Sequence, residues 1–469
     1  MLAAMGPRGE LDRRFPVLLS AIVVFGLALR IASAQGSLWL DEAWSATLAH
    51  DTGTPLGVFL KINHDNNHHL NSLWLQLVGL AAPPVLARAL SIASGTVAIW
   101  IAGRIGSRRG TVVGLTTAWL FAVSPILVTM GSEARGYAPM LLALLAAVLL
   151  VDRWLAGEIP PPRRGLAWCF ALGALSQLTM IFGVCAVVGW AFFAIWQRAG
   201  WKDAIRDSLR LFGPALLALA GVLGLIAGAA LASENGFTVG RYDPFTLAAY
   251  LRGIGDMAGY TVGIPRHDVW LPILAAILVL LAPRFGVSRL AFHRLAIIGF
   301  PLTIAILHAG NVSFARYYLL TSAALLILIG EATGLGLAAG HWKRWTAGAA
   351  LAALTAASLI QDGVLIANQR GDPGAAVRAM SAHSPGGATL RLDRETGLAV
   401  IRVAAEHQRY PLTIVDADCP PARFVFVDRF EGQSFPATIP LCGRLYRPIA
   451  SAHARGLSGT DWTLYELQP

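Results

Sequence analysis

Long apolar runs recur along most of this 469-residue chain. A run of about 20 residues can cross the roughly 30 Å hydrocarbon core of a membrane as a helix. Because that core holds no water to pair with an open backbone, a helix is the form we expect for each run. The predicted spans are 15–33, 86–103, 111–130, 136–151, 165–179, 181–196, 211–232, 271–283, 295–310, 316–338 and 345–366. The expected fold is a polytopic α-helical membrane protein with about eleven transmembrane helices.

The composition excludes several other classes of protein. Charged residues make up 14% of the chain and hydrophobic residues 55%, and the mean hydropathy is +0.58. A soluble globular domain has about 25% charged residues, so this chain has too few charges to cover a water-facing surface. Its four cysteines are too few for a disulfide framework. The first apolar run lacks a clear cleavage site before Trp39, which favours a span over a removed signal peptide.

The distribution of basic residues predicts the topology. The run 68–84 is short and ends in two prolines, so we interpret it as an interfacial or re-entrant helix within a first outer loop, 34–85. With eleven spans and a cytoplasmic N-terminus, the inner segments hold 18 Lys and Arg residues. The short outer loops hold six: Lys61, Arg135, Arg241, Arg252, Arg266 and Arg316. This bias follows the positive-inside rule. It explains the net charge of +10 without a nucleic-acid partner.

Residues 367–469 differ from the preceding transmembrane domain, 1–366. Charged residues become frequent, and β-rich runs appear at 388–393, 412–416, 423–428 and 463–467, around a helical stretch at 396–408. We predict a small α/β domain here. An odd number of spans places it outside the membrane, on the side of the 34–85 loop. Disulfides persist in such a compartment, so we predict that Cys419 and Cys442 pair.

The first outer loop concentrates polar functional groups. Its acidic pair, Asp41 and Glu42, stands between Trp39 and Trp44, which are suited to the membrane interface. A carboxylate at that interface can act as general base for a hydroxyl group. The alternative is helix capping, because acids are favoured at the start of a helix. Both interpretations of the pair remain open.

Further along the same loop, residues 64–69 read His-Asp-Asn-Asn-His-His. His64, Asp65, His68 and His69 are residue types that can bind a metal ion. The His-Glu-x-x-His spacing of zinc enzymes is absent from the chain. The alternative for this run is a polar cap on the 68–84 helix.

Arginines lie at the outer ends of several predicted spans. Glu133 and Arg135 stand in a short loop between two spans, where charges are costly unless they are paired or used. Arg316 begins a later span, and Arg88 lies near the outer end of another. The alternatives are a structural Glu133–Arg135 ion pair and arginines that reach to the interface as anchors.

These groups are expected to meet at one membrane face. Arginine presents a planar fork to phosphate oxygens, and a lysine such as Lys61 supplies a compact positive charge. When a sugar leaves a polyprenyl phosphate, the leaving group is an anion that needs positive neighbours. The acceptor hydroxyl needs a carboxylate to take its proton. One basic cluster and one acidic pair therefore favour sugar transfer from a lipid-linked phosphate.

The same residues resemble a known family. Leu29-Arg30, followed by Ser37-Leu38-Trp39-Leu40-Asp41-Glu42-Ala43, resembles the first span and acidic first loop of GT-C glycosyltransferases. The nearest branch is that of the bacterial relatives of protein O-mannosyltransferases and aminoarabinose transferases. Four more segments are similar to elements of that family: Asn67-His68-His69-Leu70, Arg88-Ala89-Leu90-Ser91, Ser132-Glu133-Ala134-Arg135-Gly136-Tyr137 and Arg316-Tyr317. The resemblance covers about residues 15–340, and the chain lacks the family's prolines after His68.

The resemblance implies a GT-C fold and an inverting glycosyltransferase that uses a polyprenyl-phosphate-linked sugar. It implies that Asp41 is the catalytic carboxylate and that Glu42 supports Asp41 or a divalent metal ion, with His64 and Asp65 as further candidate ligands. The residues expected to hold the donor phosphate are Lys61, Arg135, Tyr137, Arg316 and Tyr317. Those expected to support the site or contact the acceptor are Glu133, His68, His69 and Arg88. The C-terminal domain is expected to contact the acceptor.

The expected partners are the lipid-linked donor, membrane lipids and a lipid, glycan or protein acceptor, at the outer face of a bacterial inner membrane. Two other functions stay open. A transporter or flippase of a lipid-linked sugar would need polar or discontinuous helices at the bilayer midplane, where the candidates are few: Gln177, His308 and Glu331. A glycan ligase or polymerase that uses the same lipid carrier differs only in its substrate.

Overall fold

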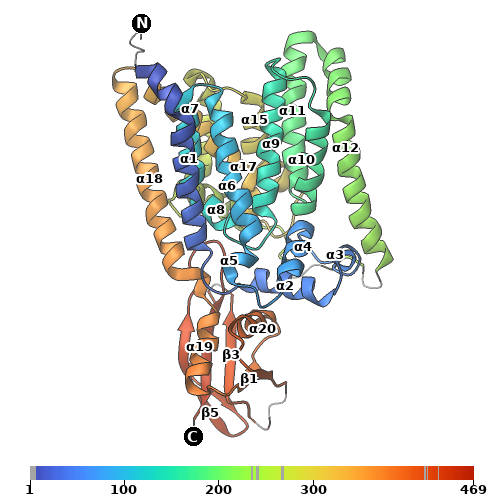
Figure 1. Cartoon of the computed structure of the whole chain (residues 1–469), viewed down its shortest axis with the longest axis vertical. Helices are drawn as coiled ribbons and strands as arrows, with labels where there is room; N and C mark the ends of the chain where they lie inside the picture. Colours follow the sequence, from blue (N-terminus) through green and yellow to red (C-terminus); the bar gives the residue numbers. More distant parts are fainter. Residues whose placement is uncertain are drawn as a thin grey trace.

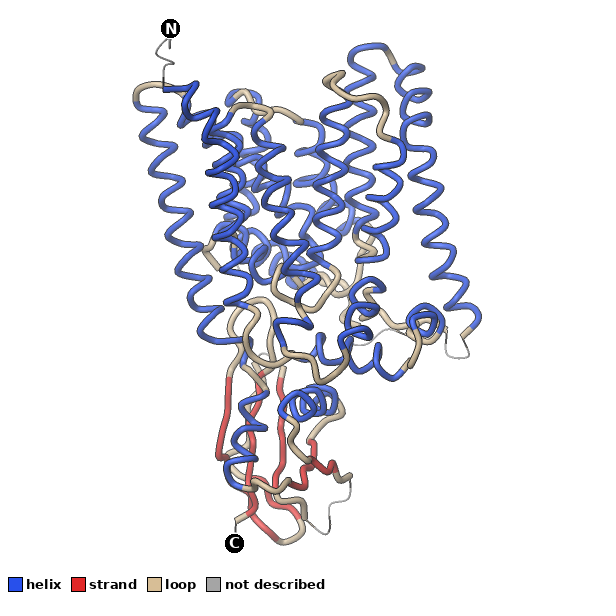
Figure 2. The backbone as a smooth tube through the Cα atoms, viewed as in Figure 1, coloured by secondary structure: helices blue, strands red, loops and turns tan. Residues whose placement is uncertain are grey.

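The structure, a computed structural model, describes residues 7–233, 236–238, 242–265, 269–416, 419, 421–430 and 432–468. A helical bundle makes up most of the molecule, and a smaller domain is attached to one end of it (Figure 1). All strands that the structure describes belong to this smaller domain (Figure 2). A set of short helices, α2 to α5, lies between the bundle and the domain (Figure 1).

Among the described residues, seven helices are long and apolar enough to cross a membrane. They are α1 (Pro7–Ser33), α6 (Ala89–Ser107), α9 (Tyr137–Leu155), α11 (Met180–Ala199), α12 (Trp201–Ala232), α17 (Leu319–Ala338) and α18 (Trp342–Asn368). Each coincides with one of the predicted spans. These helices are those of a multi-pass membrane protein.

The other four predicted spans fall on shorter helices. Residues 165–179 and 271–283 correspond to α10 (Arg163–Ser176) and α14 (Trp270–Leu281). Residues 295–310 overlap η2 (Leu295–Gly299) and α16 (Phe300–Ile306), which continue from α15 (Leu290–Arg294). The span predicted at 111–130 is divided into α7 (Thr111–Val123) and α8 (Pro125–Met130), because Pro125 has no N–H and Ser124 before it is extended. In the part of the chain that the structure describes, seven helices rather than eleven therefore have the length of a full crossing.

A loop is expected from the sequence at 233–270, but the structure has helix α13 (Leu247–Val262) there. Arg252 and Asp256 interrupt the apolar pattern of this segment. The helix nevertheless packs inside the bundle against α8, α17 and α18. Its small residue Gly253 allows a close approach to the backbone of Val312. The basic residues Arg241 and Arg266 of this region lie outside the described residues.

The first loop folds into four short helices: α2 (Leu40–Asp51), α3 (Pro55–Leu60), α4 (His69–Val78) and α5 (Pro84–Ala87). Helix α4 covers much of the run 68–84, and its ten residues are about half of what a crossing needs. It ends at Gly79, whose φ of 79° is easily adopted only by glycine. Helices α2 and α4 pack against each other at the end of the bundle that faces the C-terminal domain (Figure 1).

The C-terminal domain contains a six-stranded sheet in the order β2-β1-β3-β6-β5-β4. Its strands are β1 (Ala388–Leu392), β2 (Leu412–Ile414), β3 (Phe424–Arg429), β4 (Ile439–Leu441), β5 (Arg444–Ala452) and β6 (Asp461–Leu467). Strand β1 is parallel to β2 and β3, and the other pairs are antiparallel. Helices α19 (Gly374–His383) and α20 (Thr396–Gln408) pack on the sheet through side chains such as Val377 and Ile401. The four predicted strands are present, while β4 and β5 are additional.

Two contacts fix the C-terminal domain. The predicted disulfide between Cys419 and Cys442 is confirmed, and it links the segment before β3 to the turn before β5. Val400 and Val403 of α20 share an apolar cluster with Ala43 and Ala46 of α2. The domain therefore packs directly on the helix that carries the acidic pair.

Candidate functional site

Helix α2 brings Asp41 to two arginines from distant parts of the chain. The Oδ2 atom of Asp41 is 3.1 Å from Nη1 of Arg135 and 3.2 Å from Nη2 of Arg316. Arg135 lies in the loop before α9, and Arg316 lies in the 3-10 helix η3 (Ala315–Tyr318) before α17. The Asp41 side chain is 22% exposed, whereas those of the two arginines are 4% and 11% exposed. A partly exposed carboxylate therefore rests on two buried cations.

Polar contacts fix Arg135 in this position. Its guanidinium donates to Oδ1 of Asn66, whose Nδ2 atom donates to the backbone oxygen of Asp41 at 3.0 Å. The hydroxyl of Ser91 donates to the backbone oxygen of Arg135 at 2.9 Å. Burial alone would lower the pKa of Arg135, but the charge of Asp41 and its neighbours outweighs burial and raises that pKa. Arg135 therefore keeps its charge inside the protein.

Aromatic rings surround Arg316. Its Cζ atom is 4.4 Å from the centroid of the Phe314 ring and 5.8 Å from those of Trp39 and Tyr317, within the range of cation–π attraction. Trp39 is 5% exposed, so its expected place in an aromatic belt at the lipid surface is wrong. Arg316 is held by the Asp41 carboxylate and these rings, and the interpretation as a surface anchor is also wrong.

Four buried polar atoms near Asp41 have no hydrogen-bond partner among the described residues: Nε of Arg135, Nε of Arg316, the hydroxyl of Tyr137 and Nε2 of His68. The Cζ atom of Arg135 is 5.6 Å from the centroid of the Tyr137 ring, which is 5.3 Å from that of His68. Buried polar groups are nearly always paired with protein or water, so these unpaired atoms are candidates for contact with a polar ligand. We call these four residues and Asp41 the Asp41 cluster.

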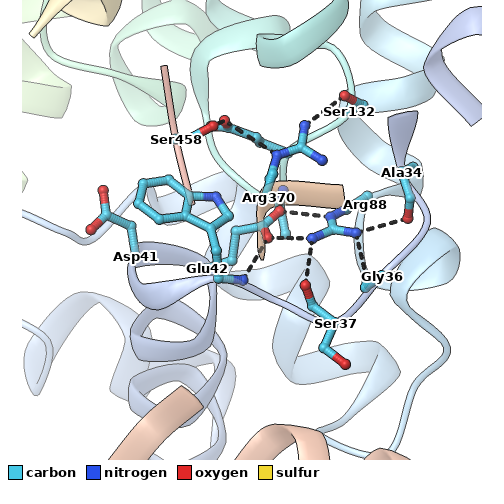
Figure 3. A network of polar contacts seen from close by, with 12 residues as sticks. Ala34, Gly36, Ser37, Asp41, Glu42, Arg88, Ser132, Arg370 and Ser458 are labelled. Atoms are coloured by element: carbon cyan, nitrogen blue, oxygen red, sulfur yellow. Dashed lines mark hydrogen bonds and ion pairs between the residues drawn. The ribbon is translucent and has the colours of Figure 1, made fainter. Parts of the chain in front are cut away.

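The neighbouring carboxylate, Glu42, points in the opposite direction (Figure 3). Arg88 donates to its two oxygens at 2.8 and 2.6 Å, and the backbone N–H groups of Trp39 and Ala134 donate at 3.2 and 2.6 Å. Burial alone would raise the pKa of Glu42, but the charge and hydrogen bonds of Arg88 outweigh burial and lower it. The contact with Trp39 is a capping contact. The capping interpretation of the acidic pair therefore applies to Glu42, and Asp41 meets the two arginines instead.

Arg88 links Glu42 to the end of α1 (Figure 3). The Glu42 carboxylate in turn fixes the loop that carries Arg135, through its contact with the backbone of Ala134. Glu42 and Arg88 thus support the Asp41 cluster by holding the loop of Arg135 in place, and neither residue belongs to the cluster. Arg88 also donates to three backbone oxygens of the turn after α1: Ala34 and Gly36, both at 2.8 Å, and Ser37 at 3.1 Å.

Glu133 pairs with Arg370, which follows α18, so the alternative of a structural Glu133–Arg135 ion pair is wrong. The Nε atom of Arg370 is 3.7 Å from Oε1 of Glu133. The hydroxyl of Ser458, from the loop between β5 and β6, donates to the same oxygen. Burial raises the pKa of Glu133. Glu133 therefore belongs to the junction between the bundle and the C-terminal domain.

Arg370 was not among the residues predicted from the sequence. It is 5% exposed and donates to the backbone oxygen of Ser33 at 2.6 Å and to the hydroxyl of Ser132 at 2.8 Å. The signal that could have indicated it is an arginine directly after the last span, on the side with few basic residues. Two more contacts of the C-terminal residues reach the start of α2: the N–H of Ser37 donates to Asp372 at 2.9 Å, and that of Leu40 donates to Thr460 at 3.2 Å.

Lys61 and His69 stay apart from the Asp41 cluster. Lys61 is exposed at the end of α3. His69 begins α4 and stacks on Phe59 with ring centroids 5.1 Å apart, and burial lowers its pKa to about 4. The Tyr317 ring, by contrast, lies beside Arg316, with its centroid 5.8 Å from the Cζ atom of that residue.

The candidate metal ligands are not brought together. Nδ1 of His64 is 2.9 Å from Oδ1 of Asp65, and the His64 ring stacks on Trp44. Both oxygens of Glu42 are bound by Arg88. Within the part of the chain that the structure describes, no group of three or more His, Cys, Asp or Glu residues is arranged to hold a metal ion. The expected set of Glu42, His64 and Asp65 therefore does not fit a metal site.

No protein-family model and no curated protein matches this chain. Solved structures do match it. The apo structure of ArnT from Cupriavidus metallidurans has a TM-score of 0.58 at 11% identity, covering 97% of this chain and 98% of that one. The structure of the same protein bound to undecaprenyl phosphate has a TM-score of 0.53 at 11% identity, covering 96% and 97%. The Archaeoglobus fulgidus oligosaccharyltransferase in complex with zinc and sulfate has a TM-score of 0.50 at 13% identity, covering 88% of this chain and 68% of that one.

ArnT, an aminoarabinose transferase, and the oligosaccharyltransferase are both GT-C glycosyltransferases. At identities of 11% and 13% the similarity concerns the course of the backbone. With ArnT it extends over nearly the whole chain, the C-terminal domain included. The fold expected from the resemblance is therefore confirmed, and this chain has the fold of the GT-C glycosyltransferases.

Proposed function

We propose that this chain is an integral-membrane glycosyltransferase that moves a sugar from a polyprenyl-phosphate-linked donor to a hydroxyl group, with inversion at the anomeric carbon. The pairing of Asp41 with Arg135 and Arg316 carries this proposal. Such a cluster combines a base with the cations that a phosphate leaving group requires. The GT-C fold, and the undecaprenyl phosphate bound to ArnT, favour a lipid-linked donor.

Asp41 acts as the general base in this proposal. The partial exposure of the Asp41 side chain allows an acceptor hydroxyl to reach it. As the carboxylate takes the hydroxyl proton, the hydroxyl oxygen attacks the anomeric carbon. The bond from that carbon to the phosphate oxygen breaks, and the phosphate keeps the electron pair. A single displacement of this kind inverts the anomeric configuration.

Arg135 and Arg316 bind the departing phosphate. A guanidinium group has five N–H donors, and the Nε atoms of both residues remain open beside the carboxylate that they share. The adjacent rings of Tyr137 and Tyr317 complete the donor site. Lys61 is left out, because no contact among the described residues joins it to the Asp41 cluster.

We place the Asp41 cluster at the outer face of a bacterial inner membrane, with the N-terminus in the cytoplasm. The excess of 18 inner over six outer basic residues supports this orientation. Residues 1–366 then form the membrane domain, and residues 367–469 form a domain outside. Glu42 and Arg88 position the reactive groups, and the acceptor is a lipid, a glycan or a protein.

The test compares cell-envelope lipids and glycans by mass spectrometry in cells with the wild-type gene, without it, and with Asp41→Asn. We expect a hexose, pentose or uronic acid that is added only by the wild-type protein. Asp51→Asn is the matched control, because Asp51 lies at the other end of α2, where it pairs with Arg402 at 3.3 Å. A sugar that Asp41→Asn still adds would exclude Asp41 as the base. Identical envelopes with and without the gene would refute the function itself.

A further inference from the structure

His68, just before α4, is held in one tautomer. Its Nδ1 atom is 3.0 Å from the backbone oxygen of Ser176. A carbonyl oxygen only accepts, so Nδ1 carries the proton and donates it. In the neutral ring the Nε2 atom is then a bare hydrogen-bond acceptor. Gly136 allows this arrangement, because a Cβ atom there would collide with the Ser176 oxygen.

The His68 ring remains neutral and its Nε2 atom remains open. The residue is 3% exposed, and burial, together with the charges of Arg135 and Arg316, lowers the pKa of His68 well below its usual range. No residue that the structure describes donates a hydrogen bond to Nε2. A buried acceptor without a partner needs an explanation.

Tyr137 provides a second open atom beside the first. Its side chain is fully buried, and its hydroxyl has no partner in the described part of the chain. The centroid of the Tyr137 ring is 5.3 Å from that of the His68 ring and 5.6 Å from the guanidinium carbon of Arg135. The two open atoms therefore lie next to the arginines that pair with Asp41.

We infer that His68 and Tyr137 bind a hydroxyl group of the transferred sugar or of the acceptor, and that this contact selects the substrate; the inference rests on the proposed function. The oxygens of an ionised phosphate only accept hydrogen bonds, and Nε2 also only accepts, so the two repel each other. A hydroxyl can donate to Nε2 and can accept from Tyr137. The Asp41 cluster then has an anion-binding end at its arginines and a hydroxyl-binding end at His68.

The first measurement separates the two ends. The probe is undecaprenyl phosphate without a sugar, and its Kd is measured with the purified full-length chain. His68→Phe keeps a ring at this position but has no acceptor atom, and we expect its Kd to stay within about 2-fold of the wild-type value. Arg135→Gln removes a charged donor, and we expect it to bind the probe at least about 10-fold more weakly.

The second measurement identifies the hydroxyl. Once the product mass has identified the sugar, donors and acceptors that lack one hydroxyl are compared by kcat/KM. We expect the kcat/KM of the wild-type protein to be about 10–100-fold lower with one deoxy compound than with the complete substrate, because the site's buried polar atoms are then left without a partner. For His68→Phe, the same deoxy compound should change kcat/KM little. If this compound is a donor, the donor reaches His68, and if it is an acceptor, the acceptor does. His50→Phe, at an exposed position on α2, is the control and should behave as wild type.

Two results would overturn the inference. One is a loss of undecaprenyl phosphate binding in His68→Phe as large as that in Arg135→Gln, because His68 would then belong to the phosphate site. The other is an equal response of wild type and His68→Phe to every deoxy compound, which would leave only water as the partner of Nε2. If His68→Phe does not fold, Tyr137→Phe removes a single oxygen and serves the same comparison. A wild-type chain that binds undecaprenyl phosphate but transfers no sugar would refute the proposed function, and the inference with it.

Discussion

The two carboxylates in the first turn of α2 have very different surroundings. Glu42 is fully buried, and both of its oxygens accept hydrogen bonds from Arg88 and from backbone N–H groups. Asp41, one residue earlier, is partly exposed, and the arginines that pair with it keep open Nε atoms. Complete pairing stabilises a fold, whereas incomplete pairing leaves groups available to a substrate. The acidic pair therefore divides into a reactive carboxylate and a supporting one.

The adjacent histidines at the start of α4 divide in the same way. His69 packs its ring on Phe59. His68 fixes one ring nitrogen on the Ser176 oxygen and leaves the other open beside Tyr137. In both pairs, one residue lies in the Asp41 cluster, and its neighbour supports the fold.

The largest effect is expected for Asp41→Asn. The amide cannot take the acceptor proton, so the initial rate of sugar transfer should fall about 10²–10⁴-fold. The Kd for undecaprenyl phosphate should change little, and the Tm should fall less than in Arg88→Met, because the asparagine oxygen can still accept hydrogen bonds from Arg135 and Arg316. Radiolabelled transfer by the purified chain measures the rate, with Asp51→Asn as control. A lowered Tm with a nearly normal rate would make Asp41 a structural residue, and the comparison with Glu42 would fail.

The next effect is a loss of stability in Arg88→Met. This change leaves the buried carboxylate of Glu42 without its cation, which costs about 3–5 kcal/mol in the free energy of unfolding. Thermal unfolding in detergent checks this expectation. Arg104→Met, at an exposed position in the last turn of the same helix α6, is the matched control. An unchanged Tm in Arg88→Met would show that Glu42 is not the supporting carboxylate.

Arg135→Gln and Arg316→Gln are expected to weaken the binding of undecaprenyl phosphate by about 10–100-fold each, because each removes a charged donor to the phosphate. The folded yield should be retained. Titration of the purified variants with this lipid measures the effect. A poor folded yield with an unchanged Kd in the remaining protein would assign both arginines to structural pairing with Asp41.

The smallest effect concerns His69. In the unfolded chain its pKa is about 6.5, and in the fold burial lowers its pKa to about 4. The unfolded state therefore binds a proton first as the pH falls, so the stabilisation is complete above about pH 6.5 and is lost toward pH 4. We expect His69 to account for about 1–2 kcal/mol of lost stability between pH 7 and pH 5. Thermal unfolding of His69→Phe should show a shallower decline, and an identical pH profile would contradict the assignment of this acid-induced loss to His69.

Hydropathy and charge predict the parts of this fold that depend on composition. The long helices coincide with predicted spans, and Asp41, Arg135 and Arg316 were expected at one face because the topology places their three segments there. Helix α13 was missed, because Arg252 and Asp256 break its apolar run although its small residues pack inside the bundle.

The division of roles within the site could not be predicted. Neighbouring side chains on a helix point in different directions, and only tertiary partners show that Glu42 faces Arg88 while Asp41 faces Arg135. A pair between Glu133 and Arg135 was one of the alternatives that the sequence left open. Its partner, Arg370, comes from a distant segment that packs beside it only in the fold.

The most direct test of the central claim compares Asp41→Asn with Glu42→Gln, two similar changes at neighbouring positions. The transfer rate per folded molecule and the Tm are measured on the same preparations. We predict that Asp41→Asn slows transfer about 10²–10⁴-fold and lowers the Tm less than Glu42→Gln does, whereas Glu42→Gln retains much more of the transfer rate. Equal loss of transfer in both variants, or the reverse pattern, would contradict the assignment of Asp41 as the reactive carboxylate.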